Sequence, residues 1–285
     1  MNRYLGVLSV AALLGGVARA DVKIVSQATV KGLPAQAQAQ MPDLGKPYTV
    51  TTYYKGDKQR VENDSDKSVT ISDFKDGKLY TLNPSKKTYY VTNFADLGKQ
   101  LEGIPLTTTL TKAEVTSGTE TKTIAGKSAH PYHFSAVMKM SLDNLDPSLS
   151  SMLPTITMDG DQWTTEAVTL PISYQTLSRT AFQRGMPAMM GQSLKGLMDK
   201  MATIKGTPLS RTFTVRFVLS DAAKSSPIAQ YMPKDPIVTT EEVTSVSEDP
   251  ISDALFTPPA DYKEVPAPTA PTGGSPFGGA PTANP

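Results

Sequence analysis

The chain has 285 residues with 28 basic and 27 acidic side chains. This near-neutral balance argues against nucleic acid as a partner, because phosphate binding needs a basic surface. The chain has no cysteine, which excludes disulfides, thiol catalysis, thiolate metal sites and an acylated cysteine anchor. A chain of this length forms one large or two small domains.

Residues 1–20 are typical of a secretory signal peptide. Arg3 supplies a positive start, residues 5–17 are apolar but too short to cross a bilayer, and Ala18-Arg19-Ala20 is a cleavage site. We therefore expect cleavage after Ala20 and a mature protein in the periplasm or secreted. Cleavage leaves 26 basic and 27 acidic residues, a net charge of about −1. No later stretch is apolar enough to span a membrane, so we expect a soluble protein.

Most of the chain predicts short strands rich in β-branched and aromatic residues. The expected strands cover residues 21–31, 47–56, 58–63, three runs within 68–91, two runs within 106–123, 126–140, a run ending near 170, 207–219 and 236–247. Asp76-Gly77 and Asn83-Pro84 are typical turn pairs between the runs of residues 68–91. Pro131 indicates a sheet edge or a bulge within its strand.

Two segments have a helical period. Phe94, Leu97 and Leu101 share one face of residues 93–103, and residues 182–205 carry an apolar stripe at spacings of three and four. Residues 266–285 are almost entirely Pro, Gly, Ala and Thr, a composition that favours a disordered tail. We thus expect three parts: a signal peptide (1–20), one folded domain (21–265) and the tail (266–285).

The pattern lacks the alternation of strands and helices that parallel sheets need, so it predicts a mainly β (α+β) domain with an antiparallel sheet of about ten strands. A sheet of this size has to curl. We expect the helices to cover its concave face and bury the inner side chains.

Three phrases in the chain resemble a known group of exported proteins: D-F-x-x-G-K-L-Y-T-L-N-P-x-K-K-T-Y from Asp73, T-K-T-I-A-G-K from Thr121 and D-A-L-F-T-P-P-A-D-Y-K-E-V from Asp253. The chain is similar to uncharacterised exported families with the lipoprotein-carrier (LolA/LolB-like) fold. The resemblance, which covers about residues 21–265, implies a curved half-barrel. It also implies an apolar cavity under a helix, with a lipid or a lipoprotein acyl chain as the ligand.

The methionine-rich helix is the best candidate for that lining. The candidate ligand-binding residues are Met186, Met189, Met190, Leu194, Leu197, Met201 and Trp163. Methionine side chains adapt to ligands of varied shape, but a methionine stripe at helical spacing is also ordinary core packing. A Cu(I) site of Met186, Met189 and Met190 is a third and weaker interpretation.

No motif predicts catalysis. His130 and His133 are the only histidines, and on a strand they point to opposite faces. Asp159-Gly160-Asp161 lacks the further oxygen ligands of a calcium loop, which favours a turn. The chain has no nucleophile elbow, phosphate loop or zinc-protease motif. We therefore expect a protein that is not an enzyme and holds no metal or cofactor.

The sequence and the resemblance together predict an exported, monomeric binding protein that holds a lipid, an acyl chain or another apolar molecule under a helix. The alternative is a structural or sensory module of the cell envelope, with its cavity filled by its own side chains and other envelope proteins as partners.

Overall fold

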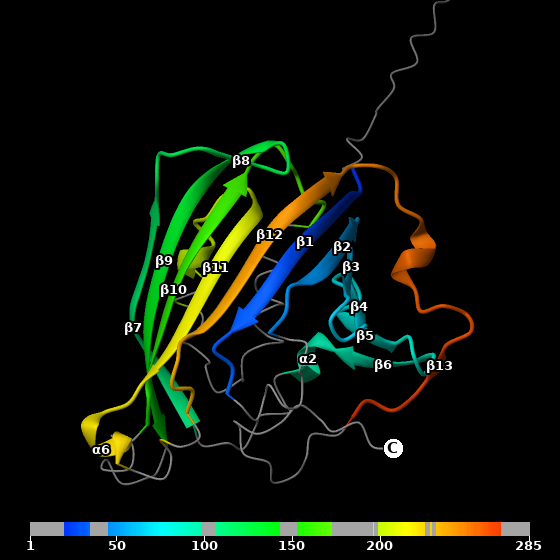
Figure 1. The fold of residues 1–285 in the computed structure, drawn as a ribbon. Helices are drawn as coiled ribbons and strands as arrows, with labels where there is room; N and C mark the ends of the chain where they lie inside the picture. Colours follow the sequence, from blue (N-terminus) through cyan, green and yellow to red (C-terminus); the bar gives the residue numbers. More distant parts are fainter. Residues whose placement is uncertain are drawn as a thin grey trace, which may run out of the picture.

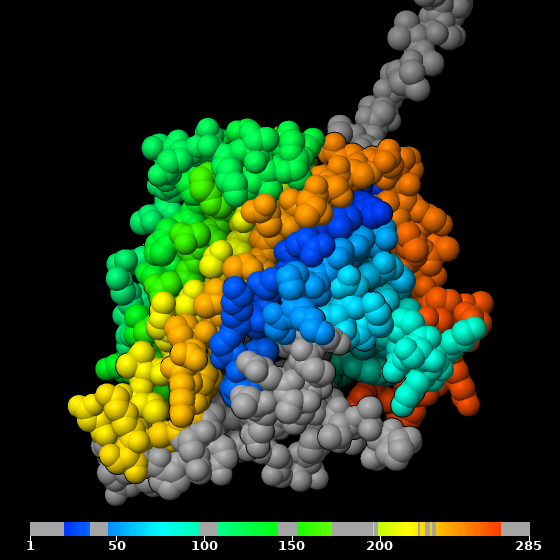
Figure 2. Space-filling model, in the orientation of Figure 1, coloured from blue at the N-terminus to red at the C-terminus, as the bar shows by residue number. Residues whose placement is uncertain are grey.

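A computed structural model describes residues 20–34, 45–97, 106–142, 153–172, 196, 199–225, 229 and 232–268. These residues form one open sheet of 13 strands in which nearly all neighbours are antiparallel (Figure 1). The order across the sheet is β13-β6-β5-β4-β3-β2-β1-β12-β11-β10-β9-β7, and the short β8 pairs with β9. Figure 2 shows the same strands side by side as one continuous surface.

The strands have these bounds: β1 Val22–Lys31, β2 Tyr48–Lys55, β3 Lys58–Asn63, β4 Val69–Asp73, β5 Lys78–Asn83, β6 Thr88–Asn93, β7 Leu106–Ser117, β8 Lys122–Ile124, β9 Lys127–Leu142, β10 Thr155–Thr165, β11 Thr207–Val218, β12 Ile237–Ser247 and β13 Lys263–Glu264. Most begin and end within a few residues of the expected runs. The two-residue β13, which pairs in parallel with β6, was not predicted.

Helices do not cover the concave face of this sheet in the described residues, so the predicted helix-covered half-barrel is wrong. The helices whose bounds lie within the described residues are α2 (Phe94–Leu97), α6 (Asp221–Lys224) and the 3-10 helix η4 (Asp253–Phe256), each only four residues long. Gly196 and residues 199–201 are also helical. Side chains of the strands, together with Val168, Leu170 and Ile172 from the segment after β10, bury the apolar residues instead. No described helix is long and apolar enough to cross a bilayer.

The sheet separates into two halves on either side of β1. The meander half comprises β2–β6, joined by tight turns, and the long-strand half comprises β7 and β9–β12. Gly56 and Gly77 adopt positive φ in turns of the meander half, a conformation that glycine accepts without strain. Pro131 lies inside β9 and pairs with Trp163 of β10, but neither β7 nor β8 pairs with it on the other side, so the expected edge is present locally.

Pro131 fits inside β9 because of a gap in the neighbouring pairing. The β7 ladder ends at the pair Ser117–Tyr132, and the β8 ladder begins at the pair Lys122–Ala129. Proline has no N–H to donate to a ladder. Pro131 lies between the end of the β7 ladder and the start of the β8 ladder, where no N–H is needed.

Three apolar clusters form the core. The first joins β1, β2, β8, β11 and β12 around Val22, Ile24 and Leu209. The second lies on β9 and β10 around Met138 and Met158, and the third lies on β4 and β5 around Ile71. We call the face that carries Val22, Ile24, Ser26 and Ala28 the inner face. Directly paired residues of antiparallel strands point to the same face, so the register places the first two clusters on the inner face and the third on the outer face.

Candidate functional site

The inner face of the long-strand half carries a row of apolar side chains. Phe213, Val215 and Phe217 alternate along β11 and are partly buried. They pair with Gly160, Met158 and Ile156 of β10. Because alternate strand residues share a face, one surface of β9–β11 is apolar along most of its length.

Gly160 makes room for the aromatic part of this row. A Cβ atom at this position would collide with the ring of Phe134, which pairs with Gly160 from β9. Phe134 and Phe213 instead stack above the glycine with ring centroids 5.7 Å apart. Asp159 and Asp161 point to the other face, where they pair with Arg216 at 3.2 Å and with His133 at 3.0 Å. The predicted turn at Asp159-Gly160-Asp161 is therefore wrong, since these residues lie within β10.

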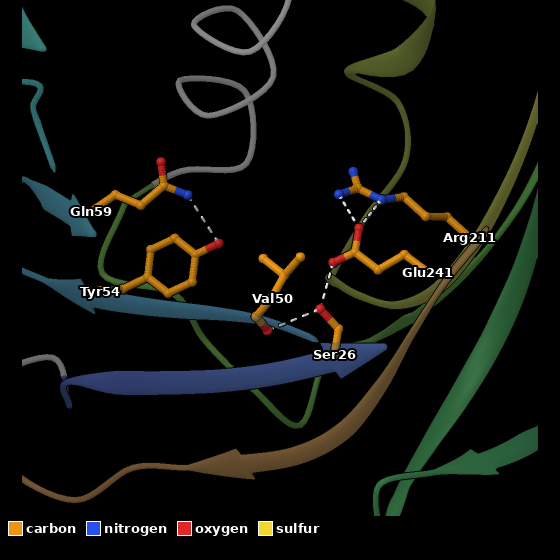
Figure 3. Close-up of polar contacts among 6 residues, drawn as sticks. All are labelled: Ser26, Val50, Tyr54, Gln59, Arg211 and Glu241. Atoms are coloured by element: carbon orange, nitrogen blue, oxygen red, sulfur yellow. Dashed lines mark hydrogen bonds and ion pairs between the residues drawn. The ribbon is translucent and has the colours of Figure 1, made fainter. Parts of the chain in front are cut away.

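An ion pair interrupts the inner face (Figure 3). Arg211 donates from Nε and Nη2 to one carboxylate oxygen of Glu241, at 2.8 and 2.5 Å. The other oxygen of Glu241 accepts the Ser26 hydroxyl at 2.8 Å. The side chain of Glu241 is 23% exposed, whereas that of Arg211 is 51% exposed. The carboxylate is thus enclosed and the guanidinium reaches toward solvent.

The ion pair lies between the two inner clusters. Along β11, Leu209 belongs to the first cluster, Arg211 forms the ion pair, and Phe213 contacts the second cluster. Along β12, Val243 belongs to the first cluster and lies two residues from Glu241. The site therefore consists of the Arg211–Glu241 ion pair with an apolar cluster on each side.

Burial alone would raise the pKa of Glu241, because a desolvated carboxylate favours its neutral form. The charge of Arg211 and the hydrogen bonds from Ser26 and Arg211 outweigh this effect, so the pKa of Glu241 lies below its usual value. Burial, followed by the charge of Glu241, raises the pKa of Tyr48 on β2. Glu241 is therefore a carboxylate at neutral pH and Tyr48 is a neutral phenol, so neither is poised for proton transfer.

Only two of the predicted site residues lie within the described residues. Met201 packs against the second cluster and Trp163 against the first, so they line different clusters. Met186, Met189, Met190, Leu194 and Leu197 lie outside the described residues, as does the Cu(I) interpretation built on three of them. Met138 and Met158 are 0% and 1% exposed, which is core packing.

Sequence reasoning missed Ser26, Arg211 and Glu241. The sequence R-T-F-T-V-R-F-V could have indicated Arg211. Alternate residues of a strand share a face, so this charged residue lies on the same face as Phe213, Val215 and Phe217. A charge on the apolar face of a strand needs a partner when it is buried. The identity of that partner depends on strand pairing, which the sequence did not supply.

Two other polar features do not form a site. The described residues contain no group of three or more His, Asp or Glu side chains placed to hold a metal ion. A hollow of about 460 Å³ lies at the turns of the meander half. Lys58 and Asp73 pair across it at 3.5 Å, as do Lys55 and Asp253 at 3.0 Å. Most of its lining residues are charged, and four of them form these two ion pairs.

Comparison with known proteins adds little. No protein family and no curated protein matches the chain. Among solved structures, the chain is similar to an uncharacterized conserved protein from Thermus thermophilus, with 8% identity and a TM-score of 0.38 over 88% of this chain and 92% of that chain. A likeness at this level carries no argument about function. The resemblance to the lipoprotein-carrier fold stays a prediction.

Proposed function

We propose that this protein is an exported, non-catalytic binding protein for an apolar ligand such as a lipid or an acyl chain. The ligand lies along the inner face of β9–β11. The observation that carries the proposal is the partly buried row Phe213, Val215 and Phe217 beside the second cluster. Each partly buried apolar side chain gains free energy when a ligand removes the rest of its surface from water, at about 25 cal/mol per Å².

The ion pair favours a ligand with an uncharged polar end. Arg211 and Glu241 neutralise each other, so a ligand carboxylate beside them would place a second negative charge next to an enclosed one. An ester or hydroxyl group brings hydrogen bonds without that charge. The ligand class that fits best is therefore a neutral acyl ester, with its chain on Phe213 and Phe217 and its polar end toward Arg211.

Export is the second part of the proposal. Asp21, the first residue after the expected cleavage site, accepts the backbone N–H of Ile251 at 2.8 Å and pairs with Lys55 at 3.4 Å. Val22 is fully buried. The first residues after the expected cleavage site are thus part of the fold. Mass analysis of protein from the cell-envelope fraction should find a chain that begins at Asp21, and a retained Met1 would contradict export.

A structural or sensory envelope module remains the second candidate. The observation that favours it is the complete burial of Met138 and Met158, because a cluster sealed by its own side chains leaves no space for a ligand.

One pair of neighbouring variants separates the candidates. Phe217→Asp places a charge on the inner row, whereas Val218→Asp places the same charge on the opposite face, where Val218 is 50% exposed. For a binding protein, Phe217→Asp should weaken the binding of a fluorescent monoacylglycerol about tenfold or more while the protein stays folded. Val218→Asp should bind as the wild type does.

Thermal unfolding is measured on the same samples. If Phe217→Asp unfolds the protein and the folded wild type does not bind the probe, the structural module is correct. If the wild type binds the probe and both Asp variants bind it equally well, the inner row is not the site.

A further inference from the structure

The two ends of the sheet differ in how they are closed. At one end, β13 pairs with β6, and the backbone N–H groups of Lys263 and Val265 donate to Lys87 and Tyr89 at 2.9 and 2.8 Å. At the other end, β7 pairs only with β9 among the described strands. Figure 1 places β7 at the left margin of the molecule, and the space-filling view shows its atoms at the same margin.

A strand with one unpaired side is a template for another strand. At 12 residues, β7 is among the longest strands of the sheet, and it contains neither proline nor glycine. It is bulged between Leu110 and Lys112, where Thr111 bonds instead to the carbonyl of Val137 at 3.0 Å. The stretch from Lys112 to Ser117 then pairs regularly with β9.

Charges on an edge strand ordinarily prevent pairing with another copy, because like charges meet. The charges of β7 have opposite signs: Lys112 and Glu114 lie two residues apart, 51% and 60% exposed, with Nζ and Oε2 3.0 Å apart. When a second copy runs antiparallel with Ala113 opposite Ala113, each Lys112 faces Glu114 of the other copy. The edge therefore attracts its own copy in this register, since directly opposite unlike charges stabilise a strand pair.

We propose that two copies of this chain pair antiparallel through β7, with Ala113 on the two-fold axis. The interface is closed, because each copy uses the same strand and the β7 edge of both copies is then occupied. Leu110 lies opposite Thr116, and Thr111 opposite Val115, on each side of the axis. This assembly replaces the monomer expected from the sequence and is independent of the proposed ligand.

Charge reversal tests the register. In sedimentation of the mature protein, the wild type should be a dimer that dissociates on dilution. K112E and E114K each place like charges opposite each other twice and should weaken dimerisation about tenfold or more. The double variant K112E/E114K should restore it. Lys139→Glu, the same change on the exposed face of the neighbouring β9, is the control and should leave the dimer intact.

Because the chain has no cysteine, a single cysteine tests the axis. Opposite residues of an antiparallel pair have Cα atoms about 4.5–5.5 Å apart, within reach of a disulfide. A113C should form a covalent dimer under mild oxidation. T109C should not, since its two copies would lie about 26 Å apart. A wild type that stays monomeric at about 1 mM, a dimer that K112E and E114K leave unchanged, or T109C bridging as well as A113C would each overturn the proposal.

Discussion

The long-strand half buries its inner face, whereas the meander half buries both faces, since Tyr54, Ser72 and Leu79 are buried on its inner face. In the long-strand half, Met138 and Met158 are buried on the inner face. In the meander half, Val69 and Ile71 of β4 are buried on the outer face, where they pack with Ile251 and Phe256. The register across β1–β4 places the third cluster on the outer face, because Ile71 aligns with Arg60, Tyr53 and Lys23, whereas Val22 and Ile24 point to the inner side.

The difference comes from what covers each half. Residues 248–265, which we call the strap, pass along the outer face of the meander half. Arg60 bonds to the carbonyl of Leu255 at 3.0 Å, and Lys55 bonds to the carbonyl of Ile251 at 2.5 Å. The alternation of apolar and polar residues along a strand predicts that one face of the strand is buried. Which face is buried depends on the segment that covers the strand. On the inner face of the long-strand half, Leu153 and Met201 pack against the second cluster, and Phe213 and Phe217 are partly buried.

Removing the main anchor of the strap should have the largest effect. Phe256 is 3% exposed and packs against the third cluster. Phe256→Ala should lower the free energy of unfolding by about 3–5 kcal/mol, the usual cost of a phenylalanine cavity. Urea denaturation measures the change. A loss below about 1 kcal/mol would show that the strap does not hold the meander half.

Met138→Ala makes the corresponding cavity in the long-strand half. Met138 is fully buried, so the free energy of unfolding should fall by about 2–5 kcal/mol. The matched control is Val137→Ala, one residue away on the opposite face, where the side chain is only partly buried. If the two variants lost equal stability in denaturant titrations, the inner face would not be the buried face of this half.

Much of the strand pattern is readable from the sequence, since alternation and turn pairs such as Asp76-Gly77 are local properties. Such local patterns do not predict the strap. β13 has two residues, and η4 lies in a phrase that only the resemblance singled out. The partner of Arg211 also depends on pairing between β11 and β12, whose residues are 30 apart. The predicted helical cover was wrong because the helices bounded within the described residues are each only four residues long. Most of the segment 182–205 lies outside the described residues.

Removing the ion pair should have a smaller effect. Arg211→Leu leaves the enclosed carboxylate of Glu241 without its main partner, which should cost about 1–3 kcal/mol. The pKa of Glu241 is lowered in the folded protein. The Glu241 carboxylate therefore stabilises the folded protein fully above the usual glutamate pKa of about 4.3. This stabilisation is lost as the pH falls through the lowered pKa of the folded protein.

Unfolding curves between about pH 7 and pH 3 measure this contribution. The wild type should lose more stability over this range than Glu241→Gln, which cannot titrate at this position. Equal losses in the two proteins would show that the carboxylate contributes nothing.

The smallest effect is expected for the tail. The backbone N–H of Val265 makes the last bond of the strap, to Tyr89 at 2.8 Å, and residues 266–285 have almost no apolar side chains to pack. A chain that ends after Val265 should keep the melting temperature of the full protein. A fall of several degrees would show that the tail packs on the fold.

The central claim is that the inner row of the long-strand half holds an apolar ligand. Mass spectrometry of an organic extract from the protein, purified without detergent from its own cell envelope, tests it most directly. We predict that the wild type carries an acyl ester in a defined ratio and that folded Phe217→Asp carries much less, while Val218→Asp is unchanged. An extract from folded wild type without lipid, together with no binding of added monoacylglycerol, would contradict the claim.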